Sequence, residues 1–341
     1  MHEARLYTAK DNGLVRCELC SHHCLITPGR RGLCQVRENR DGKLYSLVYG
    51  QVAAEAVDPV EKKPLYHFLP GSRTWSIATR GCNFRCSHCQ NHSLSQVELT
   101  ENPVGKLRSP QEIVAMARAA DCQSISYTYS EPTIFFEFAE DCALLAREQG
   151  LKNIFVSNGY MSNQAAERTA NAGKWLDAAN IDIKAFSEKF YREICGAKLA
   201  PVLETVQRLH SLGVWLEITT LIIPGQNDSE EALHNLAEFL VGISPDIPWH
   251  LSAFHPAYKL TNAPRTSLEI LLKAREIGQN AGLQYVYLGN VMLAGAGDTQ
   301  CPGCGKTVIQ RDGRGGLQLE FENHVAGTCR SCGYALAGCW S

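Results

Sequence analysis

Several things that the sequence lacks narrow what this protein can do. No apolar run approaches the ~18 residues that a membrane-spanning helix requires, and charges are scattered through the stretch where a secretory signal would be apolar. The formal net charge is −2, so no overall field attracts nucleic acid or an anionic membrane. A glycine-rich dinucleotide fingerprint is also missing. We therefore expect a cytoplasmic protein that binds neither membranes nor nucleic acid.

Cysteine, in contrast, is abundant, with 15 in a chain of 341 residues. In a reducing compartment this number favours metal or cluster sites over disulfides. Eleven of the cysteines fall into three groups, one near each end of the chain and one between them, and Cys339 is a spare cysteine beside the last group. The other three stand in apolar or helical surroundings and are expected to be small buried hydrophobic residues: Cys122, Cys142 and Cys195.

The middle group, Cys82, Cys86 and Cys89, has the spacing C-x3-C-x2-C and directly follows a short predicted strand. A loop this tight brings three thiolates around one inorganic centre, and an odd number cannot all pair as disulfides. Iron–sulfur clusters are normally held by four thiolates, so three indicate one iron left open for a substrate or cofactor. A zinc knuckle is the alternative, with His88 or His92 as the fourth ligand.

The N-terminal group has the spacing C-x2-C-x3-C-x9-C, interrupted by glycine and proline turns, and consists of Cys17, Cys20, Cys24 and Cys34. His22 and His23 are alternative ligands. We favour a structural zinc here, because four ligands close a site and because a metal folds a segment too short to have its own core. A second iron–sulfur cluster that relays electrons is the alternative.

The C-terminal group consists of two C-x2-C knuckles separated by 24 residues: Cys301, Cys304, Cys329 and Cys332. The spacing predicts a four-thiolate tetrahedral site in a zinc-ribbon or rubredoxin-like module, with zinc as the default metal and a single iron as the alternative. A turn is expected at 313–316 and a strand at 317–321. The charges of this segment are too balanced for a nucleic-acid finger.

Between the first and last groups, short β-rich runs alternate with amphipathic helices. Strands are expected at 75–79, 124–127, 153–157, 179–183, 214–223 and 249–254, with a candidate seventh at 284–288. Helices are expected at 110–120 (capped by Ser109), 133–149, 163–172, 201–211, 229–241 and 267–281. Repeated βα units specify a parallel sheet, and we predict an α/β fold with a partial (β/α)6 barrel.

The chain therefore divides into a cysteine-rich segment with a connector at 1–70, the partial barrel at 71–293 and the four-cysteine module at 294–341. His67, in the proline-rich connector, is expected to be a surface or packing residue. In such barrels the chemistry lies at the carboxyl ends of the strands. Polar, glycine and proline residues follow five strands there, among them Asp182 and Lys184 on one face of the fourth.

The cysteine loop, the Ser-Glu-Pro run at 130–132, and Asp182 with Lys184 resemble the radical S-adenosylmethionine (radical SAM) superfamily, especially glycyl-radical activating enzymes such as pyruvate formate-lyase activating enzyme. More narrowly, the segments 17–24, 61–71 and 81–91 resemble the AmmeMemoRadiSam system radical SAM enzymes. The resemblance implies a [4Fe-4S] cluster on the three loop cysteines, with S-adenosyl-L-methionine (SAM) chelating the fourth iron.

The resemblance also implies a set of SAM contacts. Phe84 would lie near the adenine and His255 near the ribose. Ser130 and Glu131 would meet the amino group of SAM, and Asp182 and Lys184 would bind its amino-acid moiety, Lys184 at the carboxylate. Asn158 is a further candidate for SAM binding. One departure from the family pattern is that Tyr129 and Ser130 stand where the activating enzymes usually carry two glycines, which limits close approach of the backbone.

The implied function is that of an oxidoreductase or activating enzyme. An external one-electron donor reduces the cluster, SAM is cleaved to methionine and a 5′-deoxyadenosyl radical, and the radical abstracts hydrogen from a substrate. A protein or peptide substrate is expected, with Memo-type and AMMECR-type proteins as candidate partners. The alternative is a zinc-binding adaptor or nucleic-acid-binding protein in which all three cysteine groups are structural.

Overall fold

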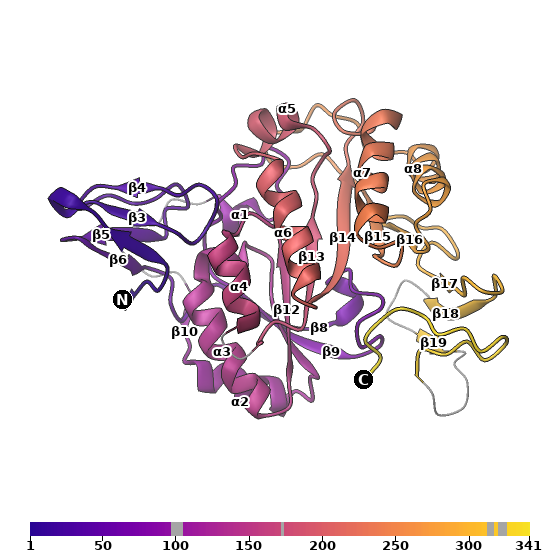
Figure 1. The fold of residues 1–341 in the computed structure, drawn as a ribbon, viewed down its shortest axis with the longest axis horizontal. Helices are drawn as coiled ribbons and strands as arrows, with labels where there is room; N and C mark the ends of the chain where they lie inside the picture. Colours follow the sequence, from indigo (N-terminus) through magenta and orange to yellow (C-terminus); the bar gives the residue numbers. More distant parts are fainter. Residues whose placement is uncertain (97–104, 172–173, 312–316, 320–325) are drawn as a thin grey trace.

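The computed structural model describes residues 1–96, 105–171, 174–311, 317–319 and 326–341. Within these residues, the centre of the molecule is an eight-stranded sheet of order β16-β15-β14-β13-β12-β11-β9-β8 (Figure 1). Its strands are β8 Ala54–Pro59, β9 Arg73–Ala78, β11 Ser124–Tyr127, β12 Lys152–Ser157, β13 Ala178–Asp182, β14 Trp215–Ile222, β15 Trp249–Ala253 and β16 Val286–Gly289.

The neighbours from β9 to β16 pair in parallel, and β8 pairs antiparallel with β9. The parallel α/β prediction is therefore confirmed, and the candidate seventh strand is present as β16. Because each parallel connection needs a crossover, a helix follows most strands. The longer helices are α2 Pro110–Ala119, α3 Phe136–Glu148, α4 Asn163–Asn171, α6 Ala200–Ser211, α7 Glu230–Ile243 and α8 Leu268–Asn280.

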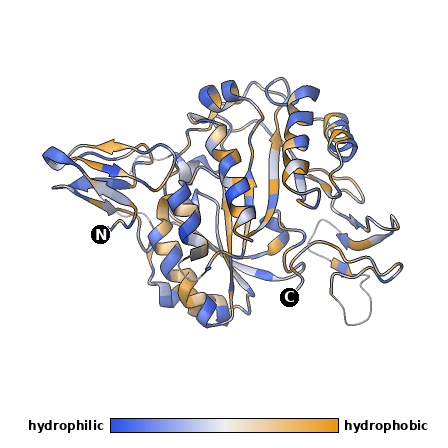
Figure 2. Ribbon diagram, viewed as in Figure 1, coloured by the Kyte–Doolittle hydropathy of each residue, from blue (hydrophilic) through white to orange (hydrophobic). Residues whose placement is uncertain are grey.

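Local sequence signals fix several helix boundaries. Ser109 caps α2 in a capping box with Glu112, and Pro110 occupies the first turn, as predicted. The helix expected at 133–149 is interrupted, because a 3-10 turn at Pro132–Phe135 precedes α3. The last residue of the helix expected at 163–172 lies outside the described residues. In α7, buried residues recur at helical spacing, and Figure 2 shows both hydrophilic and hydrophobic residues on each covering helix.

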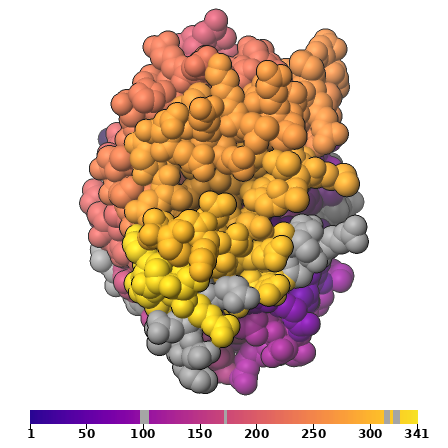
Figure 3. Space-filling view, turned by 90° about the vertical axis from the view of Figure 1, so that its right-hand side faces the viewer, coloured from indigo at the N-terminus to yellow at the C-terminus, as the bar shows by residue number. Residues whose placement is uncertain are grey.

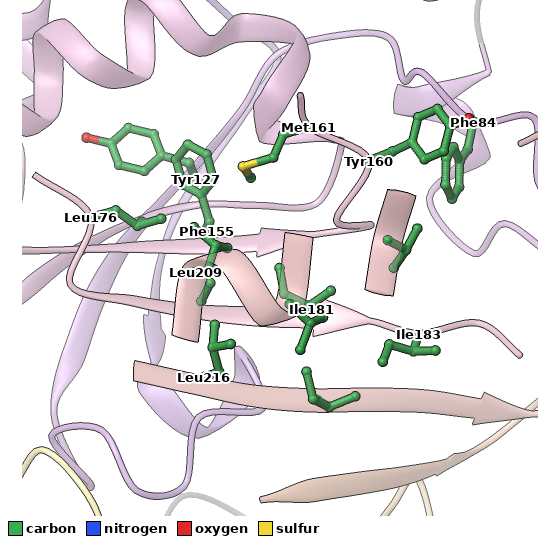
Figure 4. Packing of buried hydrophobic residues seen from close by; sticks show 14 of the residues in the cluster. Phe84, Tyr127, Phe155, Tyr160, Met161, Leu176, Ile181, Ile183, Leu209 and Leu216 are labelled. Carbon is green, nitrogen blue, oxygen red and sulfur yellow. The ribbon is translucent and has the colours of Figure 1, made fainter. Parts of the chain in front are cut away.

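The core lies between the sheet and these helices. The strands are buried on both faces, and they combine apolar residues with buried serine and asparagine. Tyr127 meets Phe155 edge to face, with 5.6 Å between ring centroids (Figure 4). Trp175 meets Phe155 in the same way. The three cysteines outside the groups are all buried in this core, as predicted: Cys122, Cys142 and Cys195.

The N-terminal segment forms two small three-stranded sheets at one end of the molecule (Figure 1). Their strands are β1 His2–Glu3, β2 Tyr7–Ala9, β3 Val15–Cys17, β4 Leu25–Ile26, β5 Arg37–Arg40 and β6 Lys43–Ser46. A fully buried ion pair between Arg37 and Glu137 joins this segment to α3, and Arg5 pairs with Glu140 and Asp141 of the same helix. Losing either member of the buried pair would leave an uncompensated charge, so this junction fixes the segment in place.

After β6 comes β7 Gln51–Val52, which pairs with β10 Lys106–Leu107, and then β8. The C-terminal module lies at the opposite end of the molecule, where Figure 3 shows it packed against the segment that carries β15, α8 and β16. It contains β17 Thr299–Gln300, β18 Thr307–Arg311 and β19 Leu317–Leu319. The predicted turn at 313–316 and the end of the predicted strand at 320–321 lie outside the described residues.

His67 joins the connector to the C-terminal module by hydrogen bonds. Its backbone carbonyl accepts from the N–H of Cys339 at 2.7 Å, and its Nδ1 donates to the carbonyl of Ala337 at 2.7 Å. Its Nε2 therefore accepts from the hydroxyl of Tyr287 at 2.6 Å. The side chain is fully buried, which lowers its pKa to about 4; Glu217 opposes this shift, and Arg311 and His250 add to it. His67 is thus a packing residue in its neutral form.

We expect His67 to make the protein less stable at mildly acidic pH. The unfolded chain binds a proton near pH 6.5, whereas the folded chain does so only near pH 4, so stability is complete above pH 6.5 and falls below it. At pH 5.0 the loss is about 2 kcal/mol. Urea unfolding at pH 7.5 and 5.0 should show a smaller difference for His67→Gln than for wild type. The exposed His210→Gln should leave the difference unchanged, and equal pH dependence in all three proteins would contradict this reading.

Candidate active site

The carboxyl ends of the parallel strands share one cavity with a volume of about 570 Å³. Nine of the ten residues predicted to hold the cluster or SAM line it: Cys82, Phe84, Cys86, Cys89, Ser130, Glu131, Asn158, Asp182 and Lys184. His255, the tenth, is not among the described residues that line this cavity. One hollow therefore joins the cysteine loop after β9 to the ends of β11, β12 and β13.

Backbone contacts hold the cysteine loop in place. Gly81 has φ +101, and a Cβ there would meet a Val36 methyl at 2.6 Å, so the turn into the loop requires glycine. The N–H groups of Arg85 and Ser87 donate to the carbonyls of Cys195 and Ile194, at 2.8 and 3.0 Å. These carbonyls belong to a π-helical turn, Tyr191–Cys195, a form that often marks functional sites. Phe84 of the loop packs edge to face on Tyr160, with 5.2 Å between ring centroids (Figure 4).

Cys195 is buried as predicted, but its contact with the cysteine loop was not predicted from the sequence. Its thiol contacts that of Cys86, and this hydrogen bond, followed by burial, raises the pKa of Cys86. The charge of Lys184 acts in the opposite direction on both Cys86 and Cys89. Because thiols bind iron as thiolates, the lysine favours the ligand form of this loop.

Asp182 and Lys184 form an ion pair at the end of β13, with 2.6 Å between Oδ2 and Nζ. Burial opposes the charge of Lys184, but Asp182 and then Cys86 hold its pKa above the ordinary value. The backbone is fixed as well, since Asn227 donates to the carbonyl of Lys184 at 2.6 Å and the hydroxyl of Tyr191 accepts from its N–H at 3.0 Å. Both charged side chains are therefore aimed at the cavity from a rigid base.

The carboxylate of Glu131 is occupied by the protein itself. It accepts from the N–H and hydroxyl of Thr133, from the hydroxyl of Ser157 at 2.7 Å and from the N–H of Asn158 at 2.8 Å. Four bonds fill the acceptor capacity of a carboxylate. Burial raises the pKa of Glu131, and these bonds oppose the rise. In this structure Glu131 positions two strand ends, and Ser157 is a partner that the sequence did not single out.

The departure from the family pattern at Tyr129 has a structural explanation. Tyr129 has φ +62, a left-handed conformation that favours glycine. Its hydroxyl donates to Asp58, and the ammonium of Lys63 lies 4.4 Å from its ring centroid. Its carbonyl accepts from Asn91 of the cysteine loop at 2.9 Å. Side-chain contacts that glycine could not make thus offset the strain of the left-handed backbone.

Several buried polar atoms around the cavity lack a hydrogen-bond partner in the described part of the chain: Ser130 Oγ, Asn180 Oδ1, Thr219 Oγ1 and His88 Nδ1. Leaving such atoms unpaired is costly, so they favour a polar ligand or water in the cavity. Burial, and then Lys184, lower the pKa of His88 to about 3, so it is neutral. Three thiols, a cationic lysine and unpaired polar atoms fit an iron–sulfur cluster with a polar cofactor.

The terminal cysteine groups differ in geometry. At the C-terminus, the thiols of Cys301 and Cys332 are 3.6 Å apart, those of Cys304 and Cys329 are 3.8 Å apart, and all four lie within 4.8 Å of one another. At the N-terminus, four thiols line an enclosed cavity of about 10 Å³ together with Asn83: Cys17, Cys20, Cys24 and Cys34. Among the described residues, neither this set nor the loop cysteines with His88 or His92 form so tight a group.

Residues 76–240 match the family profile of the radical SAM superfamily. The chain belongs to the radical SAM superfamily. An uncharacterized protein of Methanocaldococcus jannaschii, MJ0808, is 44% identical to this radical SAM protein over 312 residues, covering 91% of this chain and 92% of its own. The pyruvate formate-lyase-activating enzyme of Clostridium pasteurianum is 26% identical over 180 residues, covering 51% of this chain and 71% of that protein.

Among solved structures, Streptococcus suis SuiB has the same fold with a TM-score of 0.50 and 15% identity, covering 68% of this chain and 52% of that one. No described helix of this radical SAM protein has the length and apolar character needed to cross a bilayer. The family membership supports the iron–sulfur interpretation of the middle cysteine group over the zinc knuckle.

We expect Glu131→Gln to destabilise the fold more than Ser130→Ala. The glutamine amide replaces an acceptor oxygen with a donor, which leaves a buried N–H or hydroxyl unpaired at a cost of about 1–3 kcal/mol. The Ser130 hydroxyl has no partner in the described residues, so its removal costs little. Urea unfolding of both variants tests this difference. Equal stability of the two variants would show that the Glu131 bonds do not hold the strand ends.

Proposed function

We propose that this protein is a radical SAM enzyme that reductively cleaves SAM and abstracts hydrogen from a protein or peptide substrate. The observation that carries the proposal is the shared cavity, in which three thiols of one loop face the polar ends of the next strands. When bound, a [4Fe-4S] cluster with SAM supplies the electron transfer and the radical chemistry. We interpret the open parallel sheet as the partial (β/α)6 barrel of this superfamily.

Each residue of the chain has a defined task in this proposal. Cys82, Cys86 and Cys89 would hold a [4Fe-4S] cluster by three of its irons, which would leave the fourth for SAM. The ammonium of Lys184 pairs with the carboxylate of SAM, and Asp182 accepts from its amino group. Four hydrogen bonds already occupy the carboxylate of Glu131, whereas the hydroxyl of Ser130 has no partner in the described residues. In this loop, Ser130 is therefore the residue with a free polar group for SAM.

Similarity to the activating enzymes supports a substrate that is itself a protein or peptide. Memo-type and AMMECR-type proteins are our candidate partners, and an external one-electron donor completes the reaction. For the C-terminal module we propose zinc, because a Zn–S bond of about 2.3 Å places tetrahedral sulfurs about 3.8 Å apart. The thiol separations of 3.6 and 3.8 Å agree with this geometry.

SAM cleavage is the direct test of the proposal. Anaerobically reconstituted protein, reduced with dithionite and mixed with SAM, should release 5′-deoxyadenosine, measured by chromatography. Cys86→Ala should abolish the release because the cluster loses a ligand, whereas Cys122→Ala, a buried cysteine outside the groups, should retain it. A fully reconstituted wild type that releases none would refute the proposal. A protein that takes up no iron would instead favour the zinc-binding adaptor.

Binding tests the role of Lys184 separately from chemistry. A charge-assisted hydrogen bond contributes about 1.5–3 kcal/mol, so Lys184→Met should raise the Kd for SAM about ten- to hundredfold. Isothermal titration of reconstituted protein measures the Kd, and an unchanged iron content shows that the cluster is intact. The exposed Lys189→Met should bind SAM like wild type. An unchanged Kd in Lys184→Met would remove this lysine from the SAM site.

A further inference from the structure

The N-terminal cysteines form a looser group than the C-terminal four in the described part of the chain. The four C-terminal thiols show the spacing that a single metal ion needs, since all four lie within 4.8 Å of one another. Among the described residues, the N-terminal set does not meet this limit, and neither do the three loop cysteines that the family assigns to iron and sulfide. A polynuclear cluster binds each thiolate to a different iron, so its ligands stand farther apart than those of a single ion.

A buried cation faces the same cavity. Arg37 lines it, is 1% exposed, and gives one nitrogen to Glu137. Its Nε and Nη1 are buried without a hydrogen-bond partner in the described residues. Buried guanidinium N–H groups need hydrogen-bond acceptors, so these donors beside four thiols favour an anionic group with several sulfur acceptors in the cavity. Thiolates and inorganic sulfides of an iron–sulfur cluster provide such acceptors.

The rest of the cavity wall fits such a cluster. Leu19, Ile26 and Ile134 supply an apolar wall, which limits access of water. The cavity of about 10 Å³ is close to the space that one water needs. Cys20, Cys24 and Cys34 are half-buried and form the outer side of this cavity.

We propose that Cys17, Cys20, Cys24 and Cys34 hold a second iron–sulfur cluster, positioned to pass electrons to the cluster at Cys82. This reverses the zinc interpretation that the sequence favoured. The electron-transfer role rests on the proposed function, whereas the cluster itself does not.

Asn83 connects the two sites. It lines the N-terminal cavity and directly follows Cys82 in the chain. Its carbonyl accepts from His22 Nε2 at 2.8 Å, and its Oδ1 accepts from Asn158 Nδ2 at 2.7 Å. A single residue therefore separates the four-thiol cavity from the first ligand of the loop.

The proposed relay transfers one electron at a time. A low-potential external donor of the iron–sulfur or flavin class gives one electron to the second cluster, which then gives it to the cluster at the loop. The second cluster returns to its oxidised state, and no bond is made or broken in this transfer.

Metal analysis tests the second cluster without any activity. Anaerobically reconstituted wild type should contain about eight irons and one zinc, the sum of two four-iron clusters and the C-terminal site. Cys20→Ser should lose about half of the iron and keep its zinc. Cys304→Ser should lose the zinc and keep all the iron, and Cys122→Ala should match wild type. A wild type with four irons and two zincs would overturn the proposal, as would loss of zinc in Cys20→Ser.

Wild-type protein gives a second readout if Cys20→Ser does not fold. In electron paramagnetic resonance of the reduced protein, SAM should change one cluster signal and leave another unchanged. A single signal that SAM shifts completely would overturn the proposal.

The relay is tested by the rate at which photoreduced flavodoxin reduces the loop cluster. It should slow in Cys20→Ser and not in Cys122→Ala, and equal rates would remove the relay role. Eight irons without SAM cleavage would refute the proposed function alone, and SAM cleavage with four irons would refute the second cluster alone.

Discussion

The site depends most on the hydrogen bonds that the carboxylate of Glu131 accepts. Parallel strands offer no ladder bonds beyond their carboxyl ends, so side chains must fix the loops that follow. Glu131 does this for β11 and β12 by accepting four hydrogen bonds from Thr133, Ser157 and Asn158. Asn227 does the same for β13 and β14, donating to the carbonyls of Lys184 and Leu221. Four strand ends are thereby held rigid around one cavity.

That rigidity has an electrostatic purpose. Burial raises the pKa of Cys82 and Cys89, and the hydrogen bond with Cys195, followed by burial, raises that of Cys86; both effects oppose the thiolate form that iron requires. Lys184 is the nearby cation that lowers the pKa of Cys86 and Cys89, and Asp182 keeps it charged. Coulomb interaction weakens with distance, so fixing the backbone of Lys184 helps to keep its ammonium close to the two thiols. The residue proposed to hold the SAM carboxylate thus also supports the ligands of the cluster.

The sequence predicted those features that depend on local pattern. Strand and helix positions, the N-cap at Ser109 and the cysteine loop follow from periodicity and spacing within a few residues. It could not predict contacts between distant segments. The thiol contact between Cys195 and Cys86, the burial of His67 beneath Ala337 and the acceptor role of Glu131 toward Ser157 all arise from tertiary packing.

Cysteine spacing alone could not separate the two terminal sites, because both contain C-x2-C. The backbone separates them. At the C-terminus, Cys301 and Cys329 begin two equivalent knuckles, in which each cysteine N–H donates to a carbonyl five residues on and each cysteine carbonyl accepts at 2.8 Å. Two matching turns face each other and bring their thiols to single-ion spacing. At the N-terminus, Cys17 ends β3, Cys20 and Cys24 lie in the loop that leads to β4, and Cys34 lies between β4 and β5, so the four residues reach a shared cavity without two matching turns. The number of metal atoms that a four-cysteine group can hold is thus set by backbone geometry.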